Sequence, residues 1–134
     1  MKEREWIAVR KVMRSDVTFV DGKMNILEAM KTMKRVGATC LLVDKRHEKD
    51  EYGMLTFKDI AKKVIAENRA PERVNVFEIM TKPVISVHSD MDIRYCARLF
   101  ARFHISHAPV VENDKVIGIV SYYMLVLESL PDLD

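Results

Sequence analysis

The spacing of apolar residues changes along the chain, and the same order of changes occurs in both halves. Short extended segments at 17–20 and 84–87 come first. Apolar residues then recur three or four positions apart: Ile26, Ala29, Met30 and Met33 in the first half, and Ile93, Cys96, Ala97 and Phe100 in the second. This spacing predicts one amphipathic helix in each half. Asn25 and Asp92 directly precede these helices, and we expect them to cap the helices or to lie in their first turn.

Two short apolar runs follow each predicted helix and predict buried strands. They lie at 40–43 and 53–55 in the first half, and at 108–111 and 116–120 in the second. The polar turn 45–51, which contains His47, is expected to be a solvated hairpin tip. A final helix closes each half, at 57–65 and at 122–130. Each half is thus a β-α-β-β-α unit, and the fold class is α+β.

The two halves also align residue by residue. The aligned pairs are Met13 with Met80, Val17 with Val84, Val20 with Val87, Met24 with Met91, Ile26 with Ile93, Gly53 with Gly118, and Thr56 with Ser121. A unit of roughly 55 residues is too small to bury a good core alone, so we expect the two to pack against each other. The predicted bounds are 8–66 for the first repeat, 67–75 for a linker that Pro71 interrupts, and 76–130 for the second repeat.

Composition and charge exclude several classes of function. The 134 residues carry a net charge of +2, too small to indicate nucleic acid or an anionic membrane as a partner. No apolar run approaches the roughly 20 residues that span a bilayer, and the N-terminus has no apolar signal core, so we expect a cytoplasmic protein. Cys40 and Cys96 are expected to be reduced and buried rather than disulfide-bonded or metal-binding.

Known catalytic motifs are missing from the sequence. It contains no Walker-type loop, no HExxH and no CxxC, and no local Ser, His and Asp arrangement typical of a hydrolase. His104 and His107 are three residues apart, but two ligands do not make a metal site. The sequence therefore predicts a protein that is not an enzyme and that holds neither a metal nor a catalytic cofactor.

The segment "GMLTFKDI", residues 53–60, allows two interpretations. Thr56 and Asp59 stand where a capping box would begin the closing helix of the first half. The same helix end, with its free N–H groups and a nearby carboxylate, also suits the phosphate and ribose of a nucleotide. The second half keeps a cap candidate, Ser121, but has Met124 in place of the acid. Because the acid is not needed to build the unit twice, its presence in one half favours a ligand.

The chain resembles a tandem pair of cystathionine-β-synthase (CBS) domains. The resemblance rests on "IMTKPVISVHSDMDI", "HISHAPVVENDKVIGIVS" and "GMLTFKDI" and covers about residues 8 to 130. It implies two repeats packed as a pseudo-two-fold pair, pairs that dimerise into flat discs, and clefts between repeats that often bind adenosine-containing ligands. AMP, ADP, ATP and S-adenosylmethionine are typical of these ligands.

The resemblance also implies a set of ligand-binding residues in one asymmetric site. Asp59 would hold the ribose, Thr56 would contact phosphate or ribose, and Lys58 would add positive charge. The other implied contacts come from Ser15, Asp16, Val17 and Thr18 beside adenine, from Gly37, Ala38, Thr39 and Cys40 around the base, and from Ser106 and His107 at the phosphates.

The resulting prediction is a regulatory, signal-transducing module. An adenine nucleotide would act as its regulatory ligand, the chain would form a homodimer, and the ligand state would reach a regulated protein whose identity the sequence does not give. Two alternatives stay open: a ligand-independent dimerisation scaffold for protein interactions, and a sensor of S-adenosylmethionine.

Overall fold

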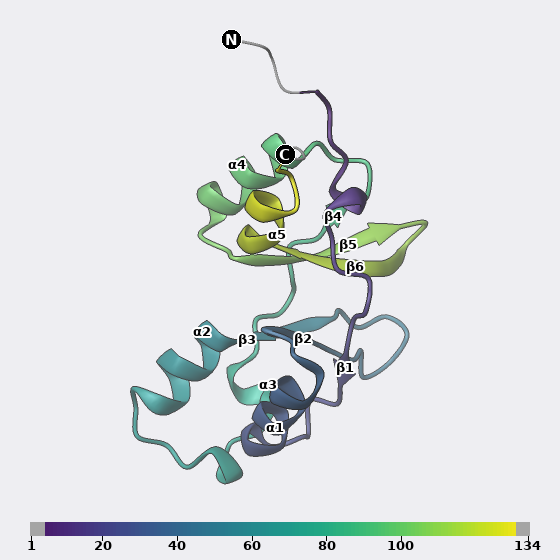
Figure 1. Ribbon diagram of the computed structural model, residues 1–134. Coiled ribbons are helices and arrows are strands. Elements are labelled where there is room, and N and C mark those ends of the chain that lie inside the picture. Colours follow the sequence, from purple (N-terminus) through teal and green to yellow (C-terminus); the bar gives the residue numbers. More distant parts are fainter. Residues whose placement is uncertain (1–4, 131–134) are drawn as a thin grey trace. The chain divides into compact units, whose positions relative to one another are not determined.

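The structure is a computed structural model that describes residues 5–130. The chain divides into two compact units, which are treated separately below. The central unit is Thr18–Val84, and the terminal unit combines the residues before Thr18 with those after Val84. Figure 1 follows the chain through the elements of each unit. Within residues 5–130, no helix combines the length and the apolar character needed to cross a membrane.

The central unit contains a three-stranded sheet in the order β1-β2-β3. Its elements are β1 (Phe19–Val20), α1 (Ile26–Val36), β2 (Cys40–Val43), β3 (Gly53–Thr56), α2 (Phe57–Ile60) with its π-helical continuation η2 (Ala61–Ile65), the 3₁₀ helix η3 (Pro71–Arg73) and α3 (Val76–Ile79). Strand β2 runs parallel to β1 and antiparallel to β3. The register places Cys40 opposite Thr56 and Val43 opposite Gly53, so these pairs mark the two ends of the β2–β3 hairpin.

The terminal unit repeats this arrangement with the order β4-β5-β6. Its elements are the 3₁₀ helix η1 (Val9–Lys11), β4 (Val87–His88), α4 (Ile93–Phe103), β5 (His107–Glu112), β6 (Lys115–Ser121) and α5 (Tyr122–Leu127). Strand β5 is again parallel to one neighbour and antiparallel to the other. Helices α4 and α5 lie on the same side of this sheet (Figure 1). The predicted α+β class and the β-α-β-β-α order of each half are confirmed.

Each unit contains one short helix that belongs, by its place in the sequence, to the other repeat. Helix η1 precedes β1 in the chain but joins the terminal unit, where Val9 N–H donates to the Met91 carbonyl at 2.8 Å. Helix α3 precedes β4 but joins the central unit, where Val76 N–H donates to the Met24 carbonyl at 2.8 Å. The terminal unit is therefore built from two separate stretches of the chain, because the two repeats exchange their first helices.

The helix starts follow the predicted capping. The Asn25 side chain accepts from Glu28 N–H at 2.9 Å, and the Asp92 carboxylate accepts from Arg94 N–H at 2.9 Å. Both caps satisfy backbone donors that a helix start leaves without an intrahelical partner. The predictions for Asn25 and Asp92 are therefore confirmed.

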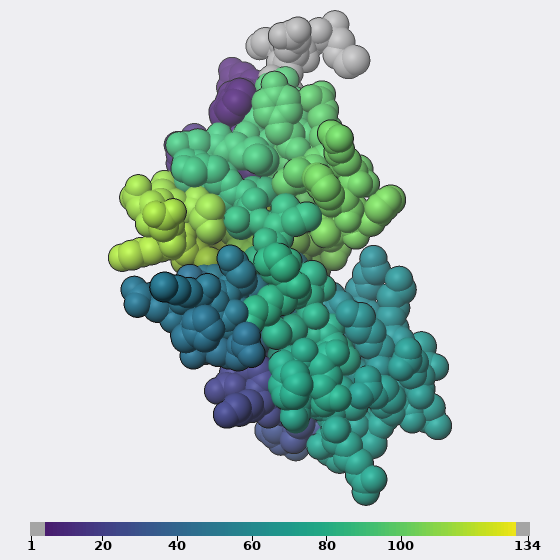
Figure 2. All heavy atoms as spheres, turned by 180° about the vertical axis from the view of Figure 1, so that it is seen from behind, coloured from purple at the N-terminus to yellow at the C-terminus, as the bar shows by residue number. Residues whose placement is uncertain are grey.

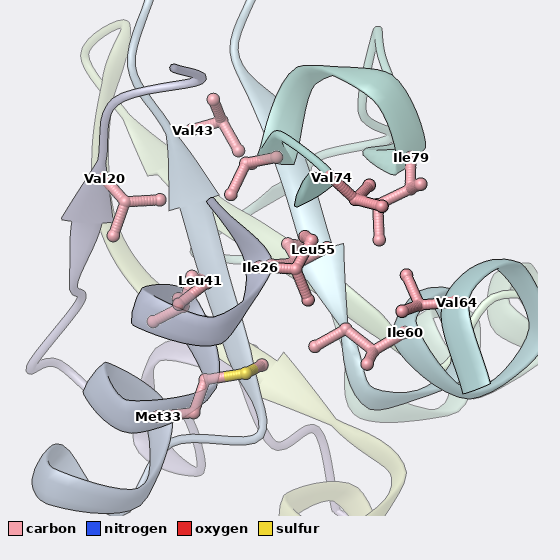
Figure 3. Packing of buried hydrophobic residues seen from close by; sticks show 12 residues of the cluster. Val20, Ile26, Met33, Leu41, Val43, Leu55, Ile60, Val64, Val74 and Ile79 are labelled. Carbon is pink, nitrogen blue, oxygen red and sulfur yellow. The ribbon is translucent and has the colours of Figure 1, made fainter. Parts of the chain in front are cut away.

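Each unit has its own apolar core. In the central unit, side chains from α1, the sheet, α2 and α3 converge on Leu41 and Leu55, which are fully buried (Figure 3). In the terminal unit, Phe100 and Val110 are fully buried at the centre of the second cluster. Cys40 and Cys96 are buried and not disulfide-bonded, as predicted. The view in Figure 2 shows α2 and η2 at the surface of the central unit, where residues 61–63 are exposed.

Gly53 and Gly118 occupy equivalent places, each beneath a methionine side chain. A Cβ on Gly53 would lie 2.6 Å from Met80 Sδ, whereas one on Gly118 would lie 2.5 Å from Met13 Sδ and 2.8 Å from the Arg14 carbonyl oxygen. A methionine side chain can move aside, but a backbone oxygen held in the β-bridge between Arg14 and Ile119 cannot move cheaply.

We therefore expect Gly118→Ala to lower the free energy of unfolding by about 1–3 kcal/mol, and Gly53→Ala to lower it less. Urea unfolding of the two variants beside the wild-type chain measures this difference. Equal losses for the two variants would contradict the assignment of the cost to the Arg14 carbonyl.

Candidate functional site

Thr56 and Asp59 form a complete capping box at the start of α2. Thr56 N–H donates to Asp59 Oδ2 at 3.0 Å, and Asp59 N–H donates to Thr56 Oγ1 at 3.3 Å. The Thr56 hydroxyl also donates to Asp59 Oδ2, at 3.1 Å. The capping interpretation of this segment is therefore confirmed as the local structure. It does not exclude a ligand, because these hydrogen bonds engage one carboxylate oxygen.

The second oxygen of Asp59 faces a lysine. Lys63 Nζ lies 3.7 Å from Asp59 Oδ1 and donates to the Ile79 carbonyl at 2.9 Å. The Asp59 side chain keeps 12% of its surface exposed, so Oδ1 lies close to solvent without being fully hydrated. A carboxylate held by backbone and hydroxyl donors on one oxygen is oriented in advance for a ligand hydroxyl on the other.

Sequence reasoning missed Lys63. The residue stands four positions after Asp59, and opposite charges at that spacing lie on one face of a helix. This spacing was visible in the sequence and could have identified Lys63 as a neighbour of the candidate carboxylate. Lys58, which was predicted to add positive charge, is exposed in the first turn of α2.

The segment 37–40 ends α1 and begins β2. Gly37 has a left-handed backbone, with φ of 68°, and the N–H groups of Gly37 and Ala38 both donate to the Met33 carbonyl. This turn leads into Cys40, which pairs with Thr56 across the sheet, while Thr39 is exposed. Burial and the nearby Asp59 charge raise the pKa of Cys40 to about 12, so its thiol stays protonated at neutral pH. The structure thus brings Cys40, Thr56 and Asp59 together.

The segment 15–18 divides between the two units. Asp16 accepts from Arg14 Nε and Nη2 at 2.7 and 2.8 Å, and this pairing lowers the pKa of Asp16. Val17 N–H donates to the Ser15 carbonyl at 3.1 Å, and the Thr18 carbonyl accepts from Leu42 N–H at 3.0 Å. Three of the backbone groups predicted to be available for adenine are therefore engaged within the protein: Val17 N–H and the carbonyls of Ser15 and Thr18.

Ser106 and His107 lie in the terminal unit at the start of β5. Ser106 Oγ is 2.9 Å from His107 Nδ1, and both residues are half-buried. His107 pairs across the sheet with Ser121, whose hydroxyl accepts from Met124 N–H at 3.4 Å. The terminal unit thus keeps the hydroxyl cap without the carboxylate that completes the box in the central unit. Among residues 5–130, no group of three or more His, Cys, Asp or Glu side chains could hold a metal ion.

Comparison with known proteins identifies this architecture. The sequence pattern that defines the CBS domain matches residues 9–66 and again residues 76–130. The chain belongs to the CBS domain family. The resemblance inferred from the sequence is therefore confirmed, and the two matched ranges make the chain a CBS domain pair.

The chain is also similar to known proteins over most of its length, and two solved structures among them are of CBS proteins. An uncharacterized protein of Methanopyrus kandleri is 32% identical over 117 residues, which cover 86% of this chain and 59% of that protein. The structure of a hexameric CBS-CP12 protein from bloom-forming cyanobacteria matches with a TM-score of 0.89 and 35% identity, over 92% of this chain and 71% of that chain. The CBS pair of protein MJ0100, in complex with 5′-methylthioadenosine and S-adenosyl-L-methionine, matches with a TM-score of 0.77 and 28% identity, over 90% and 94% of the two chains.

Proposed function

We propose that this CBS pair is a regulatory module that binds an adenosine-containing ligand beside α2 and passes the ligand state to a partner protein. The observation that carries the proposal is the pre-oriented Asp59 carboxylate, which occurs in the central unit and has no counterpart beside Ser121. Its Oδ1, which lies 3.7 Å from Lys63 Nζ and outside the capping box, can accept a hydrogen bond from a ribose hydroxyl. AMP, ADP, ATP and S-adenosylmethionine all carry that ribose.

The MJ0100 complexes favour this class of ligand, because both of the compounds in them contain adenosine. They keep S-adenosylmethionine beside the adenine nucleotides as a candidate for this chain. A regulatory ligand shifts a conformational equilibrium only when it binds the two states with different affinity. The proposal therefore requires a measurable stabilisation of one state by the ligand. A cytoplasmic location and the absence of catalysis remain predictions from the sequence.

Thermal unfolding of the chain with AMP, ADP, ATP, 5′-methylthioadenosine and S-adenosylmethionine tests the proposal. We expect at least one compound to stabilise the fold, by about 2.7 kcal/mol at 100 times its dissociation constant. Inosine monophosphate and ribose 5-phosphate serve as matched controls, since the first changes the base and the second lacks it. No stabilisation by any of the five adenosine compounds at millimolar concentration would overturn the proposal.

A second candidate function is a self-associating scaffold that needs no ligand. The observation in its favour is a group of exposed large apolar side chains on and after α5: Tyr122, Tyr123, Val126, Leu127 and Leu130. Exposed apolar groups of this extent often mark protein interfaces. The cyanobacterial relative is described as hexameric. Sedimentation carried out in the same ligand series separates the candidates: an oligomer that forms equally with and without every compound favours the scaffold.

A further inference from the structure

A cavity of about 710 Å³ lies within the central unit, at the edge of the sheet where β1 and β2 both end. Because β1 and β2 are parallel, the segments 21–23 and 44–46 that follow them meet at this edge. Val43 lines the cavity and pairs with Gly53, whereas Thr56 pairs with Cys40. The cavity is therefore at the opposite end of the β2–β3 hairpin from Asp59. Its volume is in the range of small-molecule sites, roughly 300–1,000 Å³.

The cavity lining is rich in cations. Four of its side chains are basic: Lys23, Lys45, Arg46 and Lys82. Two are acidic, Asp21 and Asp44, so the lining carries an excess of positive charge. Clefts lined mainly by one sign of charge raise the local concentration of ligands of the opposite sign. The lining therefore favours an anionic ligand.

Asp50 holds two of these cations in place. Its Oδ2 accepts from Lys82 Nζ at 2.8 Å and from Arg46 Nε at 3.0 Å. The hydrogen bond from Lys82, followed by that from Arg46, keeps the pKa of Asp50 well below its usual range, so the carboxylate is charged at neutral pH. Residues 45–49 and 51 are exposed, as the sequence predicted for this turn, whereas the Asp50 side chain is only 8% exposed. Asp50 offsets one unit of the positive charge and fixes the direction of these two cations, Lys82 and Arg46.

Part of the cavity lining is apolar. Phe77 of α3 and Met80, directly after α3, line the cavity, and 52% of the Phe77 surface is exposed. Phe77 N–H donates to the Gly22 carbonyl at 2.9 Å, which anchors the backbone that carries the ring. An aromatic ring beside a cationic edge suits a molecule that combines a planar ring with an anionic group.

The terminal unit provides an internal comparison. Arg10 N–H donates to the Ser89 carbonyl at 3.0 Å, as Phe77 N–H does to the Gly22 carbonyl. Gly22 therefore corresponds to Ser89, and the next residue, Lys23, corresponds to Asp90. Val43 pairs with Val20 and Val110 with Val87, so Lys45, two residues after Val43, corresponds to Glu112, two residues after Val110.

In the terminal unit, the side chains at the equivalent edge of the sheet bind one another. Arg10 pairs with Asp90, and Ser89 Oγ donates to Glu112 Oε1 at 2.9 Å. The basic cluster of the central unit is therefore not required to build this fold, since the same fold forms with acidic residues at Asp90 and Glu112.

We propose that this cavity is a second small-molecule site, separate from the adenosine site, and that it binds an anionic molecule carrying a planar ring. The anionic group, a phosphate or a carboxylate, lies against Lys23, Lys45 and the Asp50-oriented cations. The ring lies against Phe77. This site does not depend on the proposed adenosine site, because the two lie at opposite ends of the same hairpin.

Amide NMR titration of the full chain with phenyl phosphate and with benzoate tests the site. We expect saturable shifts of the Gly22, Lys23, Lys45 and Phe77 amides by at least one probe, with a dissociation constant on the order of 1 mM. The tighter of the two probes identifies the preferred anionic group. Inorganic phosphate reports on the anion without a ring, and benzylamine on a ring with the opposite charge.

The decisive variant is the double substitution Lys23→Asp and Lys45→Glu. It installs the residue types that the terminal unit carries at the equivalent positions, so the fold accommodates them. We expect it to weaken probe binding about tenfold or more. Lys34→Asp with Lys62→Glu is the matched control, because it changes the charge equally at exposed positions of the central unit outside the cavity lining.

Several results would overturn this site: no saturable shift of the four amides with either probe, equal affinity in the Lys23→Asp, Lys45→Glu variant and the wild-type chain, or benzylamine binding as tightly as the anionic probes. Inorganic phosphate binding as tightly as phenyl phosphate would overturn the role of Phe77. We expect Asp59→Ala to leave the NMR titration unchanged, because Asp59 does not line the cavity. A failure of the adenosine site can therefore be distinguished from a failure of this cavity.

Discussion

Asp59→Ala is expected to abolish the stabilisation of the chain by its adenosine ligand. At 100 times the dissociation constant this removes about 2.7 kcal/mol from the free energy of unfolding of the complex. The ligand-free protein loses less, about 1 kcal/mol, because the substitution also removes one side of the α2 capping box. The measurement is the ligand-dependent shift of the melting temperature, compared between the variant and the wild-type chain.

Glu78→Ala is the matched control for this experiment. The Glu78 carboxylate accepts from Asn75 N–H at 2.7 Å at the start of α3, as Asp59 accepts from Thr56 N–H at the start of α2. The control therefore removes a similar cap from the same unit without touching the candidate ribose contact. If Asp59→Ala retains the full ligand-induced shift, Asp59 is a structural cap alone.

Phe100→Ala is expected to lower the free energy of unfolding by about 3–5 kcal/mol. Phe100 is fully buried in the terminal unit, and its ring meets that of Tyr122 edge to face, with centroids 5.2 Å apart. The loss combines three contributions: the favourable transfer of the ring from water to the core, which the variant lacks, the cost of the cavity left behind, and the lost contact with the Tyr122 ring. A loss of this size is a large share of the stability of an ordinary domain.

Urea unfolding measures this loss, with Phe103→Ala as the control on the same helix. Phe103 is 50% exposed at the end of α4, so its removal is expected to cost about 0.5 kcal/mol or less. Similar losses for the two variants would contradict the buried packing of Phe100.

The parts of the fold that the sequence predicted are those encoded locally. The helix and strand order follows from apolar periodicity, and the caps at Asn25, Asp92 and Thr56 follow from side chains that satisfy the first N–H groups of a helix. The same local logic predicted the two possible roles of Asp59, and the structure supplies the geometry of the capping role.

The features that the sequence did not predict depend on contacts between distant residues. The helices η1 and α3 have only three and four residues, too few to establish a helical period, and their exchange between units is decided by backbone hydrogen bonds such as that from Val9 to Met91. The burial of Asp50 likewise depends on Lys82, which lies 32 positions further along the chain. The other residues of this turn, 45–49 and 51, are exposed as the sequence predicted.

The exchanged helices have a consequence for the order of folding. The central unit is one continuous stretch, so all of its contacts can form once Val84 has left the ribosome. The terminal unit must wait, because its first helix leaves the ribosome before the central unit does, whereas β6, in which Ile119 bridges Arg14, emerges only after the central unit. Closing such a long loop is entropically costly and slow. During synthesis, residues 5–17 therefore remain without their partners while the central unit folds.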